Sequence, residues 1–186
     1  MKKKSGFTLI ELIITLSLTV VVLGVIYTFF LTNTKTLTST ELGVDLQVEA
    51  QNIQDEILKY GTESKGIFSL NNVQIKSDNI YPYSNLASTN GKLELDEITF
   101  NVEGKLISFK HDSTNKSLKL FENNVEIKNL GNNIEEIKVR PLDYKMNLKG
   151  SFYKSNALEF SIVLSAKKGY VNVRSPLSII VKFRNQ

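Results

Sequence analysis

The stretch GFTLIELIITLSLTVVVLGVIYTFFLT, residues 6–32, decides the organisation of this chain. Residues 7–31 carry no ionisable group apart from Glu11 and the phenol of Tyr27. The run is long enough to cross a bilayer with some tilt. A carboxylate in such a helix is costly to place in lipid and should face a partner instead. Glu11 is therefore the residue that a plain membrane anchor does not explain.

The charges beside the apolar run predict its orientation. Lys2, Lys3 and Lys4 precede the run, whereas only Lys35 follows it closely. Because positive charges stay on the cytoplasmic side, we expect the N-terminus in the cytoplasm and the rest of the chain outside. A secretory signal peptide has a shorter apolar region that ends in small residues, so we expect this segment to remain with the protein.

The first residues of the run resemble a known processing signal. Gly6, Phe7, the acid at position 11 and the long apolar helix are similar to the class III signal of type IV prepilins and pseudopilins. The resemblance implies that a prepilin peptidase cleaves between Gly6 and Phe7 and N-methylates the new amino terminus of Phe7. It also implies that Glu11 pairs with the N-terminal ammonium of a neighbouring subunit, where a charge costly to bury alone becomes a register-setting contact.

The same resemblance implies a fold, partners and a location. The fold would be α+β, the type IV pilin fold, in which a long N-terminal spine helix packs on an antiparallel β-sheet domain. The partners would be other pilin subunits, the prepilin peptidase, the inner-membrane assembly platform and the cytoplasmic membrane. The protein would cross the cytoplasmic membrane once before assembly and lie in an extracellular pilus afterwards, and no cofactor is implied.

Beyond the apolar run the sequence predicts that the helix continues to Tyr60. Apolar residues recur with helical spacing and form one stripe. The stripe consists of Leu42, Leu46, Ala50, Ile53, Ile57 and Tyr60. Gly61 is the predicted C-terminal stop. Residues 32–36 are poor helix formers, so we expect a bend or local melting there.

From residue 66 onward the apolar period changes from helical to alternating, which predicts antiparallel strands. The predicted strands are 97–102, 106–109, 117–121, 125–127, 134–139, 157–166, 170–174 and 177–183. Tight turns are expected at Glu103-Gly104 and at Asn123-Asn124, because glycine and asparagine tolerate positive φ. Residues 69–89 are expected to be an irregular connection.

These patterns predict four segments. Residues 1–6 would be a leader peptide, and residues 7–32 a transmembrane or filament-core helix. Residues 33–60 would continue the spine as an amphipathic helix, and residues 61–186 would form the β-rich head domain. About 150 residues outside the membrane suffice for one globular core.

The sequence offers no catalytic or metal-binding constellation. There is no cysteine, which excludes thiol catalysis and thiolate metal sites. The only histidine, His111, stands in a turn-like stretch, where we expect a surface loop. The adjacent acids Glu135 and Glu136 would point to opposite faces of a strand. We therefore expect no enzyme activity and no bound metal or cofactor.

Nucleic acid is not an expected partner either. The net charge is +4, but without the three N-terminal lysines it would be +1. Lys167 and Lys168 could lie at a hairpin tip beside Tyr170, yet a lysine-rich turn is usually a solubilising feature. A nearly neutral chain creates no broad field for phosphates.

The order of the predicted strands gives a weaker resemblance to the minor pilins that include PilW and the type II secretion pseudopilin GspJ. It implies a low-copy subunit that primes assembly or lies near the filament tip, in a pilus used for adhesion, twitching motility or colonisation. One alternative is a minor pseudopilin of a type II secretion or competence (DNA uptake) system. Another is a membrane-anchored adhesin without a filament role.

Overall fold

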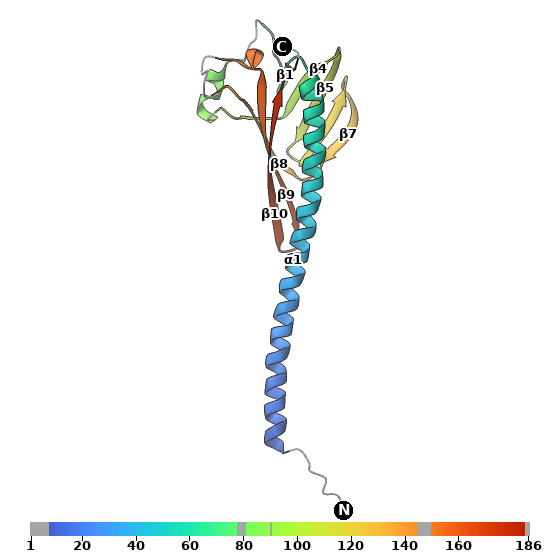
Figure 1. Ribbon diagram of the computed structural model, residues 1–186, viewed down its shortest axis with the longest axis vertical. Helices are drawn as coiled ribbons and strands as arrows, with labels where there is room; N and C mark the ends of the chain where they lie inside the picture. The colour runs from blue at the N-terminus through green and yellow to red at the C-terminus, as the bar shows by residue number, and fades with distance from the viewer. Residues whose placement is uncertain (1–7, 78–80, 90, 145–149, 185–186) are drawn as a thin grey trace, which may run out of the picture. The chain divides into compact units, whose positions relative to one another are not determined.

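The computed structural model describes residues 8–77, 81–89, 91–144 and 150–184 of the chain. The chain divides into two compact units, Met1–Glu41 and Leu42–Gln186. One α-helix, α1 (Leu9–Glu63), contributes to both units. Figure 1 shows this helix and the strands of the second unit.

The first unit consists of the N-terminal part of α1, whose side chains are exposed almost throughout. Hydroxyl side chains along it donate hydrogen bonds of 2.8–3.0 Å to the carbonyl four residues earlier. They are Thr15, Ser17, Thr19, Thr28, Thr32, Thr34, Thr36, Thr38 and Thr40. These bonds satisfy the hydroxyls inside the helix itself. The helix is continuous through residues 32–36, so the expectation of local melting there was wrong for this structure.

The C-terminal part of α1 belongs to the second unit and buries one face. Leu46, Ala50, Ile53 and Ile57 of the predicted stripe are all buried. The helix ends at Glu63 instead of Tyr60, so the predicted stop at Gly61 was wrong. A Cβ at position 61 would lie 2.5 Å from Cγ1 of Val181, so glycine is required there for close packing instead of for helix termination.

Two antiparallel sheets complete the second unit, and the predicted fold class, α+β with a long helix packed on antiparallel sheet, is confirmed. The first sheet has the order β2-β1-β4-β5-β6-β7. Its strands are β1 (Ile67–Leu70), β2 (Val73–Gln74), β4 (Glu97–Val102), β5 (Lys105–Asp112), β6 (Ser117–Glu122) and β7 (Val125–Gly131). The second sheet has the order β10-β9-β8-β3. Its strands are β3 (Leu93–Glu94), β8 (Ile134–Pro141), β9 (Ala157–Lys168) and β10 (Val171–Lys182).

The tight turns follow the predicted residue types. Glu103 and Gly104 join β4 to β5 with φ of 51° and 86°, and Asn123 and Asn124 join β6 to β7 with φ of 48° and 67°. Two consecutive residues with positive φ give the turn whose twist matches that of the flanking strands. Both predicted hairpins are therefore confirmed.

The strand prediction was wrong at Pro176 and within residues 69–89. Pro176 does not separate two strands but lies inside the single strand β10, opposite Val163. Because β10 is an edge strand, a residue without an N–H group can be accommodated there. The segment predicted to be irregular contains β2 and the 3-10 helix η1 (Tyr83–Thr89). These elements are too short to give a clear periodic pattern.

The core of the second unit lies between the two sheets and α1. Phe100 and Phe109 of the first sheet and Phe160 of the second are each at most 1 % exposed. Tyr60 of α1 packs edge-on against Phe109, with ring centroids 6.4 Å apart. The helix is therefore an integral part of this core, and residues 42–63 cannot be removed without opening it.

Candidate assembly and anchoring site

Glu11 lies in the first turn of α1 and closes a capping box with Thr8. The backbone N–H and the hydroxyl of Thr8 donate to Oε2 of Glu11, at 2.9 and 2.8 Å. The backbone N–H of Glu11 donates in return to Oγ1 of Thr8, at 3.3 Å. Reciprocal bonds of this kind satisfy donors that the start of a helix leaves unpaired, and the carboxylate also complements the helix dipole. The acid therefore has a structural role within its own chain.

The other carboxylate oxygen of Glu11, Oε1, takes no part in the capping box. Within the part of the chain that the structure describes, no hydrogen bond to Oε1 is recorded. The apolar side chains around it, such as Ile10 and Leu12, are more than 60 % exposed. One oxygen thus caps the helix while the other can accept a donor from another molecule.

The other N-terminal residues predicted to function lie outside the described residues. They are Lys2, Lys3, Lys4, Gly6 and Phe7. Their proposed roles in topology, cleavage and methylation stay predictions.

Thr8 is the residue that the sequence interpretation overlooked. The pattern Thr-x-x-Glu immediately before an apolar run is the sequence signature of a capping box. Here it is Thr8-Leu9-Ile10-Glu11. This signature is local, so the sequence predicts an intramolecular role for Glu11 beside an intermolecular one.

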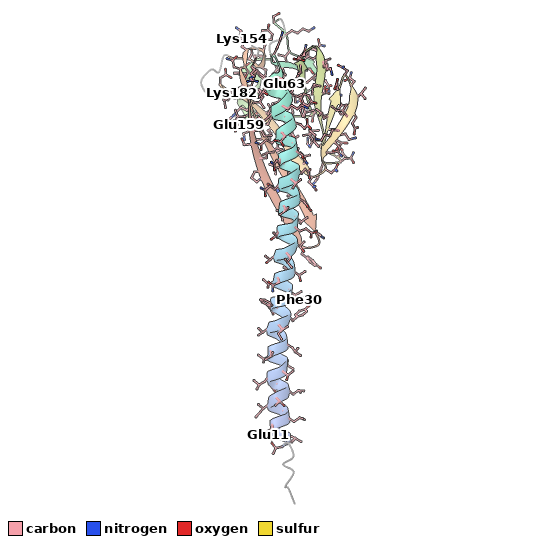
Figure 2. All side chains as sticks on the ribbon, turned by 45° about the vertical axis from the view of Figure 1, so that its right-hand side comes forward. Glu11, Phe30, Glu63, Lys154, Glu159 and Lys182 are labelled. Atoms are coloured by element: carbon pink, nitrogen blue, oxygen red, sulfur yellow. The ribbon has the colours of Figure 1, made fainter. Side chains whose placement is uncertain are left out.

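The apolar segment of α1 has the properties of a membrane anchor. Its helix is long and apolar enough to cross a membrane, and its most apolar window buries none of its surface within the chain. Figure 2 shows Glu11 at the start of this helix and Phe30 near the end of the apolar run. Such a surface needs lipid or other apolar helices around it.

Polar contacts fix the C-terminal part of α1 on the head. Glu49 accepts from the backbone N–H of Asn133 at 2.9 Å and from its side-chain amide at 2.7 Å. A Cβ at Gly131 would clash with Oε1 of Glu49, so the carboxylate occupies the space beside that glycine. About two helical turns further along α1, Oε1 of Glu56 forms an ion pair with Nζ of Lys128 in β7, at 2.6 Å. These contacts fix both the rotation of the helix and its position along the sheet edge.

The candidate reactive groups of the head have structural partners. His111 lies on β5 opposite Leu118, not in the expected loop, and its Nε2 is 3.4 Å from the carbonyl of Ile134. Glu135 pairs with Arg174, while the adjacent Glu136 pairs with Lys138. Among the described residues, no three His, Asp or Glu side chains are grouped so that they could hold a metal ion.

Tyr83 is a buried titratable group of the head whose hydroxyl has a hydrogen-bond partner. It is 1 % exposed, and its hydroxyl donates to Oδ1 of Asp143 at 2.7 Å. Burial and the hydrogen bond to Asp143 raise the pKa of Tyr83 well above its ordinary value of 10. Tyr144 and Phe152 pack against its ring, so the group is part of an aromatic cluster and not of an open site.

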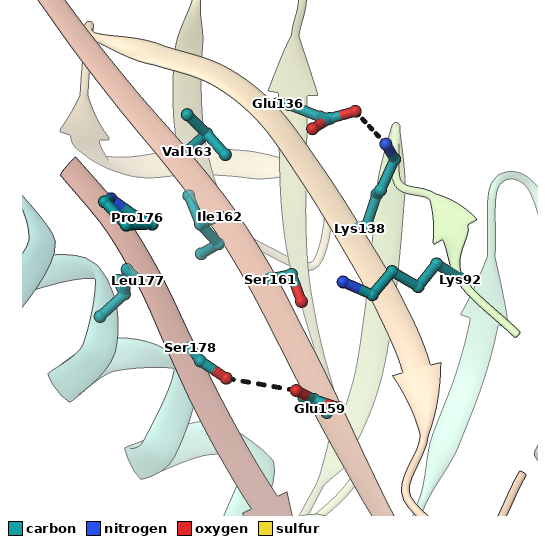
Figure 3. A pocket seen from close by; sticks show the side chains of 10 residues that line it. All are labelled: Lys92, Glu136, Lys138, Glu159, Ser161, Ile162, Val163, Pro176, Leu177 and Ser178. Atoms are coloured by element: carbon teal, nitrogen blue, oxygen red, sulfur yellow. Dashed lines mark hydrogen bonds and ion pairs between the residues drawn. The ribbon is translucent and has the colours of Figure 1, made fainter. Parts of the chain in front are cut away.

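A hollow of about 520 Å³ lies on the outward face of the four-stranded sheet (Figure 3). Its acids already have partners, since Glu136 pairs with Lys138 and Glu159 pairs with Arg140. Ser178 points its hydroxyl toward Glu159, at 3.4 Å. The hollow is open, and both of its acids are paired within the chain.

Comparison with known proteins identifies the N-terminal region. A profile of the prokaryotic N-terminal methylation motif matches residues 1–27. Neither the curated proteins nor the solved structures contain a match to this chain. The matched motif is that of type IV pilin-like precursors, and it agrees with the long apolar helix that begins within it. The match ends before the head domain, so the similarity to PilW and GspJ stays a prediction.

Proposed function

We propose that this chain is a structural subunit of a type IV pilus, held in the cytoplasmic membrane by α1 until a filament takes it up. The single observation that carries the proposal is the methylation motif, which overlaps the start of a helix whose apolar side chains are not buried by any of the residues that the structure describes. A helix of this kind can exchange lipid for the helices of other subunits, because both environments are apolar. The partners are then other pilin subunits, the prepilin peptidase and the inner-membrane assembly platform.

In this function Glu11 acts on two molecules at once. Oε2 holds the N-terminus of its own helix through Thr8, and Oε1 accepts the N-terminal ammonium of the neighbouring subunit. In an apolar bundle an unpaired charge is disfavoured, so the pair selects one register between the two helices. The capping bonds hold the carboxylate in a defined position before the neighbour arrives.

The processing step is tested by intact-mass measurement on the native protein. The mature chain should begin at Phe7 with a methylated amino terminus. A chain that retains residues 1–6 in cells with active prepilin peptidase would contradict the proposal.

The two roles of Glu11 are separated by a pair of variants. Glu11→Gln keeps an oxygen that can accept from Thr8 but removes the charge. Thr8→Val removes the hydroxyl of the capping box and leaves the charge in place. We expect the Glu11→Gln protein to be cleaved and to accumulate in the membrane without entering sheared filaments, whereas the Thr8→Val protein should still enter them. Wild-type incorporation of the Glu11→Gln protein would exclude a charge contact.

Within the filament we assign the chain the role of a minor pilin that primes assembly or lies near the tip. The support for this is the order of its strands, and the assignment is tested by copy number in purified pili relative to the major pilin. A pseudopilin of a type II secretion or competence system shares the same N-terminal features. Its sign would be loss of secretion or DNA uptake, with surface pili intact, when the gene is deleted.

A further inference from the structure

The hollow on the outward face of the four-stranded sheet is lined by residues of β8, β9 and β10 and by Lys92. Lys92 directly precedes β3, and its side chain is half-buried. Figure 3 shows this side chain extending across the hollow toward Ser161. All of the lining residues belong to the second unit, so the hollow is formed within that unit alone.

The acids that line the hollow already have cationic partners. Glu136 forms an ion pair with Lys138, and Glu159 forms one with Arg140. The side chain of Lys92, in contrast, makes no hydrogen bond or ion pair with any residue that the structure describes. Its ammonium is therefore available to an anion that enters the hollow.

A row of polar side chains crosses the sheet at the hollow. The register of the strands places Lys138 opposite Ser161, and Ser161 opposite Ser178. Residues directly opposite each other lie on the same face of a sheet. Glu94 stands at the end of this row, opposite Lys138, and its charge acts on that ammonium. The row thus offers two hydroxyl groups, each of which can donate and accept.

The neighbouring row is apolar. Val163 of β9 lies opposite Pro176 of β10, and both residues line the hollow. Their side chains give a small apolar surface on which the carbon-bound hydrogens of a ring can pack. The volume of about 520 Å³ lies within the range of about 300–1,000 Å³ that is typical of small-molecule sites.

The chemistry of the hollow favours one class of ligand. An amine would bring a second positive charge to Lys92, and a long acyl chain would need more apolar surface than Val163 and Pro176 offer. Nucleic acid would need several free cations. A sugar ring that carries a carboxylate fits, because it combines one negative charge with several hydroxyls and an apolar ring face.

We propose that the hollow binds a sugar acid, in which a sugar ring carries one carboxylate, as in a uronic acid. The carboxylate accepts a charge-assisted hydrogen bond from Nζ of Lys92. The ring hydroxyls bond to Ser161 and Ser178 while the ring lies on Val163 and Pro176. The inference goes beyond the proposed function, since it concerns the second unit alone and holds whether or not the chain enters a filament.

Titration of the full chain with sodium glucuronate tests the site. The protein is kept in a detergent with polyethylene glycol headgroups, because a maltoside headgroup is itself a sugar. Lys92→Gln removes the ammonium of the site. Lys182→Gln is the matched control, since Lys182 is an exposed lysine of β10 that lies outside the lining of the hollow. The readouts are the heat of binding and the NMR shifts of the Val163 methyl groups.

We expect the wild type and the Lys182→Gln protein to bind glucuronate equally. The Lys92→Gln protein should bind it at least about tenfold more weakly, because a hydrogen bond between charged groups is lost. Lys92→Arg should retain most of the affinity, whereas Ser161→Ala should weaken binding severalfold without changing the charge.

Two other probes separate the charge from the ring. Glucose has the ring without the carboxylate, and acetate has the carboxylate without the ring, so each should bind at least about tenfold more weakly than glucuronate. An oligosaccharide that ends in glucuronate identifies the source of the ligand. Tighter binding than that of glucuronate indicates the end of a polysaccharide, and weaker binding indicates a free sugar acid.

Three results would overturn the inference. One is that glucuronate does not bind the wild type. Another is equal affinity of the wild type and the Lys92→Gln protein, which would mean that the ammonium holds no ligand. The third is that acetate binds as tightly as glucuronate, which would mean that the hollow recognises charge only.

Discussion

Between Leu9 and Leu31 the large apolar side chains of α1 are all at least 41 % exposed, whereas Leu46, Ile53 and Ile57 of the same helix are at most 2 % exposed. Both regions are helical, but different forces hold them. In the first region hydroxyl groups bond back to the helix, and none of its side chains is buried by the described part of the chain. In the second region one face is buried in the core of the head.

The difference shows that the two regions of the helix suit different surroundings. Residues of the first region are apolar on every side, as expected where lipid or neighbouring helices surround a helix. Residues of the second region alternate between a buried stripe and polar faces, because one side meets the sheets and the others meet water. The same backbone thus carries an anchor and a structural element of the head.

The largest effect tests whether the head folds without the apolar region of α1. A truncated protein that starts at Thr34 should be a soluble, folded α+β monomer, because its core contains no residue before Leu46. In this protein Ile53→Ala should lower the free energy of unfolding by about 2–5 kcal/mol, since it leaves a cavity in the core. The measurement is denaturant unfolding followed by circular dichroism.

The matched control for Ile53→Ala lies on the opposite face of the same helix segment. Val48 is 56 % exposed, and its replacement by alanine should change the free energy of unfolding by no more than about 0.5 kcal/mol. Equal losses for the two variants would mean that residues 42–63 pack on something other than the head.

Two glycines of α1 differ in the space around them, and replacing each by alanine should change the stability of the protein in opposite directions. Gly61→Ala places a methyl group against Val181 and should destabilise the head by about 1–3 kcal/mol. Gly43 has open space around it, so Gly43→Ala should instead stabilise the protein by roughly 0.5–1 kcal/mol. Thermal and denaturant unfolding of both variants tests the sign. If Val181→Ala does not relieve the Gly61→Ala defect, close packing is not its cause.

The polar attachment of α1 should contribute somewhat less than its apolar face. Glu49→Ala removes the acceptor for both donors of Asn133, and hydrogen bonds to a charged group contribute about 1.5–3 kcal/mol. The exposed Asp45 provides the control, and Asp45→Ala should leave the unfolding curve unchanged. A loss confined to Asp45→Ala would contradict the role given to Glu49.

The smallest effect concerns pH. Burial raises the pKa of Tyr83 above its ordinary value of 10, so the folded state favours the neutral phenol. This contribution is fully present below pH 10 and is lost as pH rises from 10 through the higher pKa of the folded state, by at most about 1.4 kcal/mol per pH unit.

Removing the Tyr83 phenol should flatten the pH profile. The Tyr83→Phe protein should lack this loss of stability above pH 10, although it will be less stable at neutral pH because Asp143 loses a donor. The measurement is denaturant unfolding of both proteins between pH 8 and pH 11. If the free energy of unfolding falls equally for both proteins above pH 10, the pKa of Tyr83 is not raised in the folded state.

The sequence by itself determined the features that depend on local pattern. The apolar run, the stripe Leu46, Ala50, Ile53 and Ile57, and the hairpin turns at Glu103-Gly104 and Asn123-Asn124 were all predicted from residue type and spacing. Local sterics and the helical and strand periods fix these features wherever they occur. The capping box of Thr8 and Glu11 belongs to the same group, since its signature is local.

Only the tertiary structure decided how these elements meet. The division of the strands into a six-stranded and a four-stranded sheet depends on contacts between residues far apart in the chain. The sequence predicts a helix stop at Gly61, whereas in the structure this glycine gives room to the side chain of Val181. The sequence predicts a strand boundary at Pro176, whereas this residue lies inside the edge strand β10. The contact of Glu49 with Asn133 links two segments that no short-range pattern connects. In each case the deciding energy comes from packing and hydrogen bonding across the fold, which a periodic pattern cannot report.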